Sequence, residues 1–429
     1  MKLLRPPLSG SFSLNISIIL LLLAASVLAS GQEKIIYRFK GGTDGERPVA
    51  GLVADRSGNL YGTTSGGGNQ CGCGTVFEFS PRRGGGWTKT VIYNFLGGSS
   101  DGEGPTANLV FDQMGDLYGT TGGGGASREG TVFQLSPPPQ EGGDWTETVL
   151  YSFTGHFLEL FPSSLTIDEA GNLYGENPGD ENGTDGYVYE LTPSTKGGGA
   201  WTYSVLYSFQ GFLDNDGSTP TGALLLDKSG NLYGTTAFGG EDVYEYPCDG
   251  SGCGTVFELK HPAKQGAAWT EKVLYRFTNK PDGAEPLGGV SWGRNGSSLY
   301  GTTSLGGSQS LGTVFQLSPP SEQGGAWTET ILSNFFASGA TLPNSRVVFD
   351  RTGNLYGTTV AGQYKSSGGV FELSPPVQQG DPWTETTLYA GPPGATTTSG
   401  VILNKSDNTL FGTLSNTGKY GVLFKVTLP

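Results

Sequence analysis

The sequence predicts an all-β protein: a seven-bladed β-propeller with four antiparallel strands in each blade. Three observations predict this fold. A repeat of about 56 residues occurs seven times, each repeat holds four apolar runs of strand length, and the two chain ends supply complementary parts of one repeat. Four-stranded antiparallel sheets repeated around a channel are the architecture that fits these observations.

The repeat is marked by the phrase GNLYGTT at residues 58–64, which returns with changes in every later unit. Its aromatic residue sets the spacing, at Tyr61, Tyr118, Tyr174, Tyr233, Tyr300, Tyr356 and Phe411. Successive markers are 57, 56, 59, 67, 56 and 55 residues apart, so the fourth unit carries an insertion.

Each unit holds four apolar runs, seen clearly at 107–111, 117–121, 131–135 and 145–153. Polar and apolar residues partly alternate in the third and fourth runs, which is typical of strands with one buried face. The first two runs are joined by a turn that starts with aspartate and contains glycine. Aspartate can cap its own backbone there, and glycine accepts a positive φ. We therefore expect a structural role for the repeated turn aspartates Asp55, Asp112, Asp168, Asp227 and Asp350.

The two chain ends predict how the ring closes. Residues 34–39 match the fourth run of a unit, whereas the last unit stops after its third run at 421–429. Pairing 35–39 antiparallel with 422–427 completes the seventh blade and removes an exposed strand edge. Six of the seven tryptophans begin a fourth run: Trp87, Trp145, Trp201, Trp269, Trp327 and Trp383.

Residues 1–29 are predicted to be a signal peptide. Lys2 and Arg5 precede an apolar run at 18–25, and Val27-Leu28-Ala29 supplies the small residues that a signal peptidase reads. The apolar run is short for a membrane span, and no cysteine for a lipid anchor follows it. We expect one propeller domain over residues 30–429, secreted or periplasmic after cleavage near Ala29, with no membrane span in the mature protein.

The charge of the chain argues against nucleic acid as a partner. The formal net charge is −14, and removal of Lys2 and Arg5 with the signal peptide makes it −16. An acidic surface without a Lys/Arg cluster repels a phosphate backbone. The expected partner is a glycan or a protein, and the expected state is a monomer.

The pattern GNLYGTT, GTVFELSP, WTETVLYSF resembles the Gloeo_Verruco repeat of exported bacterial proteins, and the resemblance covers residues 33–429. It implies bacterial export and a propeller-like array, and it implies no established activity. Many such proteins carry a C-terminal anchor. This chain ends at its last repeat, which favours free release or periplasmic residence.

Ligand-binding residues are predicted on one face of the ring. In this strand order, the loops from strand four to strand one share a face with the loops from strand two to strand three, and both kinds are long and varied. The largest deviation is an insert at 239–248, where tyrosines next to acids can stack on and hydrogen-bond a sugar. The alternative is a loop that packs its own aromatic residues. The candidates are Tyr244, Tyr246, Asp242, Glu245, Asp216 and Phe212.

The four cysteines predict one local disulfide. Cys248–Cys253 closes an easy loop, and export favours it. Cys71 and Cys73 would close a strained ring, so we expect that pair to stay reduced or to react reversibly. No zinc site fits the spacing, and residues 214–217 resemble the start of a calcium loop without its distal glutamate. We expect no metal and no cofactor.

Unit three departs most from the repeat. Glu176 and Asn177 replace its two threonines, and Asp180, Glu181 and Asp185 follow. A pair of these carboxylates near the channel mouth would supply the two carboxyl groups that glycoside chemistry uses. The alternative is repeat drift with a solvated acidic loop.

These features favour a non-catalytic module that binds a glycan or a protein through the loop-rich face. The units repeat no catalytic residue, the chain holds two histidines, His156 and His261, and no Gly-x-Ser-x-Gly motif is present. The alternatives are a secreted glycoside hydrolase or lyase with carboxylates at the channel mouth, and a structural surface component. The fold cannot choose among them, because propellers host all three.

Overall fold

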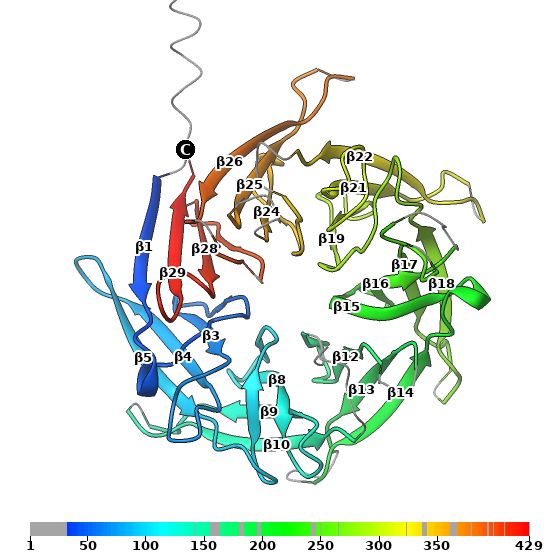
Figure 1. Ribbon diagram of the computed structural model, residues 1–429. Coiled ribbons are helices and arrows are strands. Elements are labelled where there is room, and N and C mark those ends of the chain that lie inside the picture. The colour runs from blue at the N-terminus through cyan, green and yellow to red at the C-terminus, as the bar shows by residue number, and fades with distance from the viewer. Residues whose placement is uncertain are drawn as a thin grey trace, which may run out of the picture.

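The computed structural model describes residues 32–428 except 141, 155–163, 180–183, 195–198, 242–245, 249, 265, 323, 337–340, 361–366, 379, 393, 398 and 407. These residues form seven antiparallel sheets around a channel (Figure 1). The predicted seven-bladed propeller is therefore confirmed.

The blades follow one plan of four antiparallel strand positions from the channel outward, and in blade two the first two strands share the innermost position. Blade one holds β2 (Val53–Ala54), β3 (Leu60–Thr64), β4 (Thr75–Pro81) and β5 (Trp87–Asn94). Blade two holds β6 (Gly102–Pro105), β7 (Val110–Phe111), β8 (Leu117–Gly124), β9 (Thr131–Ser136) and β10 (Thr146–Ser152), with β6 and β7 both paired to β8. Blade three holds β11 (Thr166–Ile167), β12 (Leu173–Asn177), β13 (Tyr187–Thr192) and β14 (Thr202–Ser208).

The remaining blades follow the same order. Blade four holds β15 (Gly217–Leu226), β16 (Leu232–Gly239), β17 (Thr255–Lys260) and β18 (Thr270–Arg276). Blade five holds β19 (Val290–Trp292), β20 (Leu299–Thr303), β21 (Thr313–Ser318) and β22 (Thr328–Asn334), and blade six holds β23 (Val348–Phe349), β24 (Leu355–Thr359), β25 (Gly369–Ser374) and β26 (Thr384–Ala390). Short 3-10 turns lie at η1 (Gly42–Asp44) and η2 (Phe212–Asp214).

The seventh blade joins the two ends of the chain. Strands β27 (Ile402–Asn404), β28 (Thr409–Leu414) and β29 (Val422–Thr427) come from the C-terminus, and β1 (Gln32–Arg38) pairs antiparallel with β29 from Gln32↔Thr427 to Arg38↔Val422. Blue β1 lies beside red β29 in Figure 1. The predicted ring closure is confirmed.

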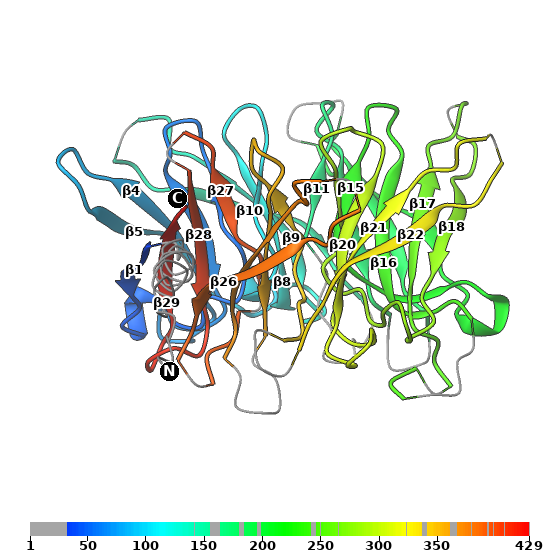
Figure 2. The same ribbon diagram turned by 90° about the horizontal axis from the view of Figure 1, so that it is seen from above.

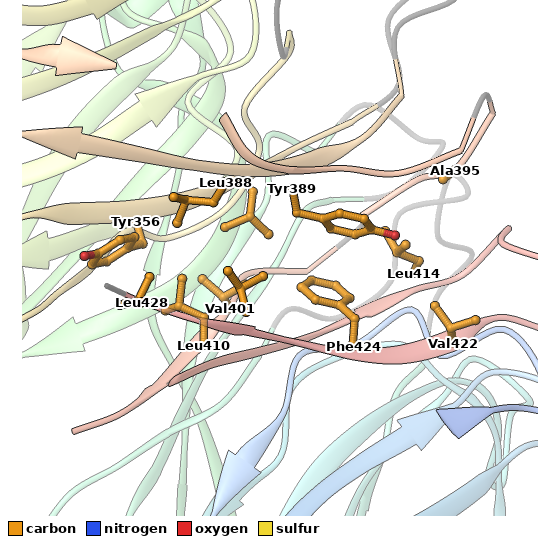
Figure 3. Close-up of a cluster of buried hydrophobic side chains, with 12 residues drawn as sticks. Tyr356, Leu388, Tyr389, Ala395, Val401, Leu410, Leu414, Val422, Phe424 and Leu428 are labelled. Carbon is orange, nitrogen blue, oxygen red and sulfur yellow. The ribbon is translucent and has the colours of Figure 1, made fainter. Parts of the chain in front are cut away.

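A glycine–aromatic pair fills the core of each blade. The glycine of the Gly-Thr-Thr phrase lies opposite an aromatic residue of the third strand, as Gly119 lies opposite Phe133. That ring also contacts an aromatic residue from the end of the preceding blade, with centroids 5.0–5.5 Å apart all round the ring. Figure 3 shows this packing where Tyr389 of blade six meets Phe424 of blade seven. The hydrophobic core is therefore continuous from blade to blade.

The repeated tryptophans and turn aspartates also have structural partners. Trp145 of blade two packs on Tyr61 of blade one, with centroids 6.3 Å apart, and Trp87 packs on Phe411 across the closure at 5.5 Å. Asp55 accepts hydrogen bonds from the backbone N–H groups of Ser57 and Asn59 at 2.8 and 2.9 Å. The same capping at Asp112, Asp168, Asp227 and Asp350 confirms the predicted role of these turn residues.

Gly119 has no room for a side chain, and this predicts the cost of Gly119→Ala. A Cβ atom there would lie 2.6 Å from Phe133 Cζ and 2.9 Å from Leu109 Cδ2, both in the core. We expect a loss of about 1–3 kcal/mol in the free energy of unfolding, as for other overpacked cores. Denaturant unfolding measures it.

Gly123→Ala in the same strand is the matched control. A Cβ atom at Gly123 meets its nearest neighbour, Glu103 Cβ, at 3.5 Å, which is ordinary contact. The control should stay within about 0.5 kcal/mol of the wild type. Equal losses in both variants would contradict the packing argument.

No helix among the described residues is long and apolar enough to cross a membrane.

Candidate functional site

The two groups of long loops share one face, as the sequence predicts. The loop that enters blade one pairs with the β3–β4 loop of the same blade through the bridge Glu46↔Gly66, and Gly68 N donates to Gly42 O at 2.7 Å. The entering loop also reaches the preceding blade, where Arg47 N donates to Tyr420 O at 2.9 Å. Figure 2 shows the ring edge-on, with loops at both faces. The loop that enters blade one is thus held by two blades.

A cavity of about 1040 Å³ leads from this face into the channel. The first strands of the blades and the segments that precede them line it, and most of the lining consists of glycine, serine, threonine, proline and small apolar residues. Three charged residues line it within the described part of the chain: Arg47, Glu103 and Arg346. The cavity wall is therefore built mainly of small residues, polar and apolar, and carries few charges.

Arg346 occupies a position that recurs in every unit, four residues before the start of the turn between strands one and two. The seven residues at this position are Gly51, Asn108, Ser164, Ala223, Gly289, Arg346 and Gly400. They lie close together because the ring brings the first strands to the channel. For example, Gly51 N donates to Asn108 Oδ1 at 2.5 Å, and Asn108 N donates to Ser164 Oγ at 3.0 Å. Arg346 is the single charged residue of the seven.

The Arg346 side chain crosses from blade six to blade four. Its guanidinium donates a hydrogen bond through Nη2 to the Ala223 carbonyl. Burial lowers the pKa of Arg346 to about 10, and the negative charge of Glu176 opposes that shift. Glu176 belongs to blade three and is 0% exposed. At neutral pH Arg346 therefore remains a cation, held at the channel wall.

Three polar atoms beside the cavity have no hydrogen-bond partner among the described residues. They are Arg346 Nε, Asn344 Oδ1 and Thr221 Oγ1, and each is buried. All three residues line the cavity. Buried polar atoms are nearly always hydrogen-bonded, so these three atoms beside the cavity are exceptions.

Three of the residues predicted from sequence, Phe212, Asp216 and Tyr246, are described, and they lie in loops of blade four. Tyr246 is 77% exposed, and its carbonyl accepts a hydrogen bond from Asn279 Nδ2 at 3.0 Å. Phe212 begins η2 and is partly buried. Neither residue lines the cavity. Asp242, Tyr244 and Glu245 lie outside the described residues.

Asp216 has a structural environment. Its carboxylate accepts hydrogen bonds from Tyr207 Oη at 2.8 Å, Gln210 N at 2.9 Å and Gly217 N at 2.6 Å. Asp101 and Asp282 stand at the same place in other blades with the corresponding partners. The Asp216 oxygens therefore hold the loop that enters blade four.

Both cysteine pairs form disulfides. Cys248 is bonded to Cys253, as the sequence predicts. Cys71 is also bonded to Cys73, whereas the sequence analysis expected this pair to stay reduced or to react reversibly. The described residues contain no group of three or more His, Cys, Asp or Glu side chains arranged to hold a metal ion.

The acidic loop of unit three is only partly described. Asp180 and Glu181 lie outside the described residues, as does His156. Asp185 lines a second pocket of about 360 Å³ at the loops of blade three. Glu176 is buried behind the channel wall and does not line the cavity.

A further set of carboxyl groups lies at equivalent positions in the outer strands. The residues two positions after Trp145, Trp269 and Trp327 are Glu147, Glu271 and Glu329. Burial, together with the charge of an aspartate in the loop that enters the same blade, raises the pKa of each glutamate to about 7. The aspartates are Asp101, Asp216 and Asp282.

The residue two positions after the fourth-strand tryptophan has different contacts in different blades. Oε1 of each of these three glutamates is buried without a hydrogen-bond partner in the described part of the chain. In blade one the same position holds Lys89, whose Nζ lies 3.1 Å from Asp44 Oδ1. A cation therefore pairs with the loop aspartate in blade one, whereas two acids face each other in blades two, four and five.

Sequence reasoning missed Arg346. The signal was present, because aligning the seven units shows one arginine among six uncharged residues at the position. The role of Arg346 depends on which strand lies at the channel and on which side chains face it. Neither can be read from the sequence of one repeat.

Seven antiparallel blades in a closed ring define the class of the protein as a tandem-repeat β-propeller. The model of the Gloeobacter/Verrucomicrobia repeat matches residues 26–246 and 246–429, so the chain belongs to that family. No curated protein matches the chain.

Solved structures with the same fold are distant in sequence. A Lactobacillus plantarum protein is 14% identical with a TM-score of 0.51, covering 82% of this chain and 87% of its own. A polysaccharide lyase, an ulvan lyase bound to -[GlcA(1-4)Rha3S]-, is 9% identical with a TM-score of 0.53, covering 92% and 94%. A putative oxidoreductase (glucose dehydrogenase) from Thermus thermophilus is 16% identical with a TM-score of 0.46, covering 77% and 97%. The first two similarities show the fold alone.

Proposed function

We propose that the protein is a non-catalytic binding module that takes a saccharide into the channel from the loop-rich face. The cavity beside unpartnered polar atoms of Thr221 and Asn344 carries this proposal. Its volume lies at the upper end of the range of about 300–1,000 Å³ for ligand pockets, so it has room for a short oligosaccharide. Hydroxyl, amide and backbone groups in the wall suit a ligand rich in hydroxyl groups.

The alternative is a carbohydrate-active enzyme with two carboxylates at the channel mouth. Glycoside hydrolysis of the usual kind takes a pair of carboxyl groups that flank the scissile bond. Among the described residues one carboxylate, Glu103, lines the cavity. This observation favours binding over hydrolysis.

We also propose that the protein acts outside the cytoplasm, secreted or periplasmic after removal of residues 1–29. The disulfides Cys71–Cys73 and Cys248–Cys253 support this location, because disulfides persist in oxidising compartments. Mass spectrometry of the exported protein tests the cleavage site near Ala29.

The channel site predicts that Thr106→Trp weakens glycan binding. Thr106 lines the cavity on the blade-two side, and an indole there fills part of the space that the ligand needs. A glycan array of residues 30–429 identifies ligands, and calorimetry should then show at least about a tenfold loss of affinity for the variant, equal to 1.4 kcal/mol. Product analysis in the same samples should show intact glycan.

Two controls separate the channel from other surfaces. Thr148→Trp places the same indole on the exposed face of β10, so affinity should stay unchanged. Tyr246→Ala tests the blade-four surface that the sequence favours. Loss of binding in Tyr246→Ala with full binding in Thr106→Trp would move the site to blade four, and cleaved glycan would favour the enzyme.

A further inference from the structure

Arg346 is the single charged residue among the seven equivalent positions beside the channel. The residues at the other six equivalent positions are uncharged, and their blades have the same fold, so the fold does not require a cation there. The side chain lies partly buried in a wall of small residues, where an unneeded charge costs free energy.

Glu176 is a second exception, and it interacts with the first. Its six equivalents, the first threonines of the Gly-Thr-Thr phrase or the residue aligned with them, are Thr63, Thr120, Thr235, Thr302, Thr358 and Thr413. The charge of Glu176 raises the pKa of Arg346 from a separate blade. Because Glu176 is fully buried and Arg346 lines the cavity, the glutamate stabilises the charged guanidinium from behind while the arginine faces the ligand space.

The groups around Arg346 suit an oxyanion. A guanidinium binds a carboxylate or a sulfate through parallel N–H groups, and Arg346 Nε has no acceptor in the described structure. Thr221 Oγ1 can donate to the same anion, and Asn344 Oδ1 can accept from a neighbouring hydroxyl group. The hydrogen bond from Arg346 to the Ala223 carbonyl joins the segments that carry Arg346 and Thr221, so both groups are available to one ligand.

We propose that the channel selects an acidic saccharide and binds its anionic group through Arg346. The inference rests on the proposed function, because it names the ligand class of the same cavity. The protein carries a net charge of −14 and as a whole repels anions. A preference for an acidic sugar therefore has to come from a local cation.

The experiment compares the affinities of residues 30–429 for a panel of matched oligosaccharides. Each pair differs by oxidation of the sugar C6 to a carboxylate, and a sulfated form of each neutral member is added as a third arm. We expect the wild type to bind an acidic form at least about tenfold more tightly than its neutral partner, as for a charge-assisted hydrogen-bond pair. The carboxylate and sulfate arms show which anion is preferred.

Arg346→Gln should reduce this preference to about twofold or less and should leave neutral binding in place. Arg56→Gln is the matched control, because it removes an equal charge from an exposed turn outside the cavity and should keep the preference. If Arg346→Gln does not fold, Arg346→Lys keeps the charge without the planar fork and should lose most of the preference for carboxylate.

The outcomes separate the two proposals. Equal affinity for neutral and acidic partners in the wild type overturns the acidic preference and leaves the saccharide-binding proposal standing. A preference that survives in both Arg346 variants overturns the assignment to Arg346. Absence of binding across the whole panel overturns the proposed function itself.

Discussion

Deletion of residues 31–40 is expected to abolish cooperative folding and to cause aggregation. The deletion removes β1, the outer strand of blade seven, and leaves β29 as an unpaired edge from Val422 to Thr427. It also removes Phe39, which is 4% exposed and packs on Phe77 of blade one at 5.3 Å. Loss of a buried phenylalanine alone costs about 3–5 kcal/mol, a large part of a total stability of about 5–15 kcal/mol.

Light scattering and thermal melting of the truncated protein measure this effect against residues 30–429. A synthetic peptide of residues 31–40 is the matched control. It should restore part of the solubility by pairing with β29, because β1 contacts the ring through backbone hydrogen bonds and one face of side chains. A truncated protein that stays monomeric and melts at the same temperature would contradict the closure as a source of stability.

The stability of the protein is expected to fall as the pH rises from about 4.5 to about 7. In the folded protein the pKa values of Glu147, Glu271 and Glu329 are about 7, above the value of 4.5 for an unperturbed glutamate. Within this window the folded state holds protons that the unfolded state has released, so each rise in pH favours unfolding. Above about pH 7 both states are ionised at these groups, and their effect no longer changes.

The triple variant Glu147→Gln, Glu271→Gln, Glu329→Gln should flatten this dependence. We expect a gain on the order of 1–2 kcal/mol at pH 8 for the three together, and little change at pH 4.5. This is well below the sum of the separate shifts, because solvent still reaches part of each side chain and screens the charges. Urea unfolding at several pH values measures both numbers.

A control with the same change in net charge is available on the surface. Glu169→Gln, Glu322→Gln and Asp381→Asn change three exposed carboxylates, so this variant should keep the wild-type pH dependence. If both triple variants flatten the curve equally, net charge rather than the outer-strand acid pairs is responsible.

The repeat phrase, the four apolar runs and the complementary chain ends were sufficient to predict seven blades and the pairing of β1 with β29. The features of a blade are local, because a strand, a turn with Asp112 and a glycine opposite Phe133 depend on neighbours within one unit. The disulfide Cys248–Cys253 is local for the same reason. The pairing of β1 with β29 is long-range, and it could be predicted because each chain end supplies the part of a unit that the other end lacks. The sequence by itself therefore determined the architecture.

Only the tertiary structure decided where the cavity lies. The sequence pointed to the blade-four insert, because extra chain is visible as a change in spacing. Arg346 and Glu176 stand 170 residues apart and look like isolated substitutions in two repeats. They interact because closure of the ring brings the innermost strands of all seven blades to one axis, so that blades three, four and six meet at one wall. That convergence depends on the packing of whole blades against one another, which no single repeat encodes.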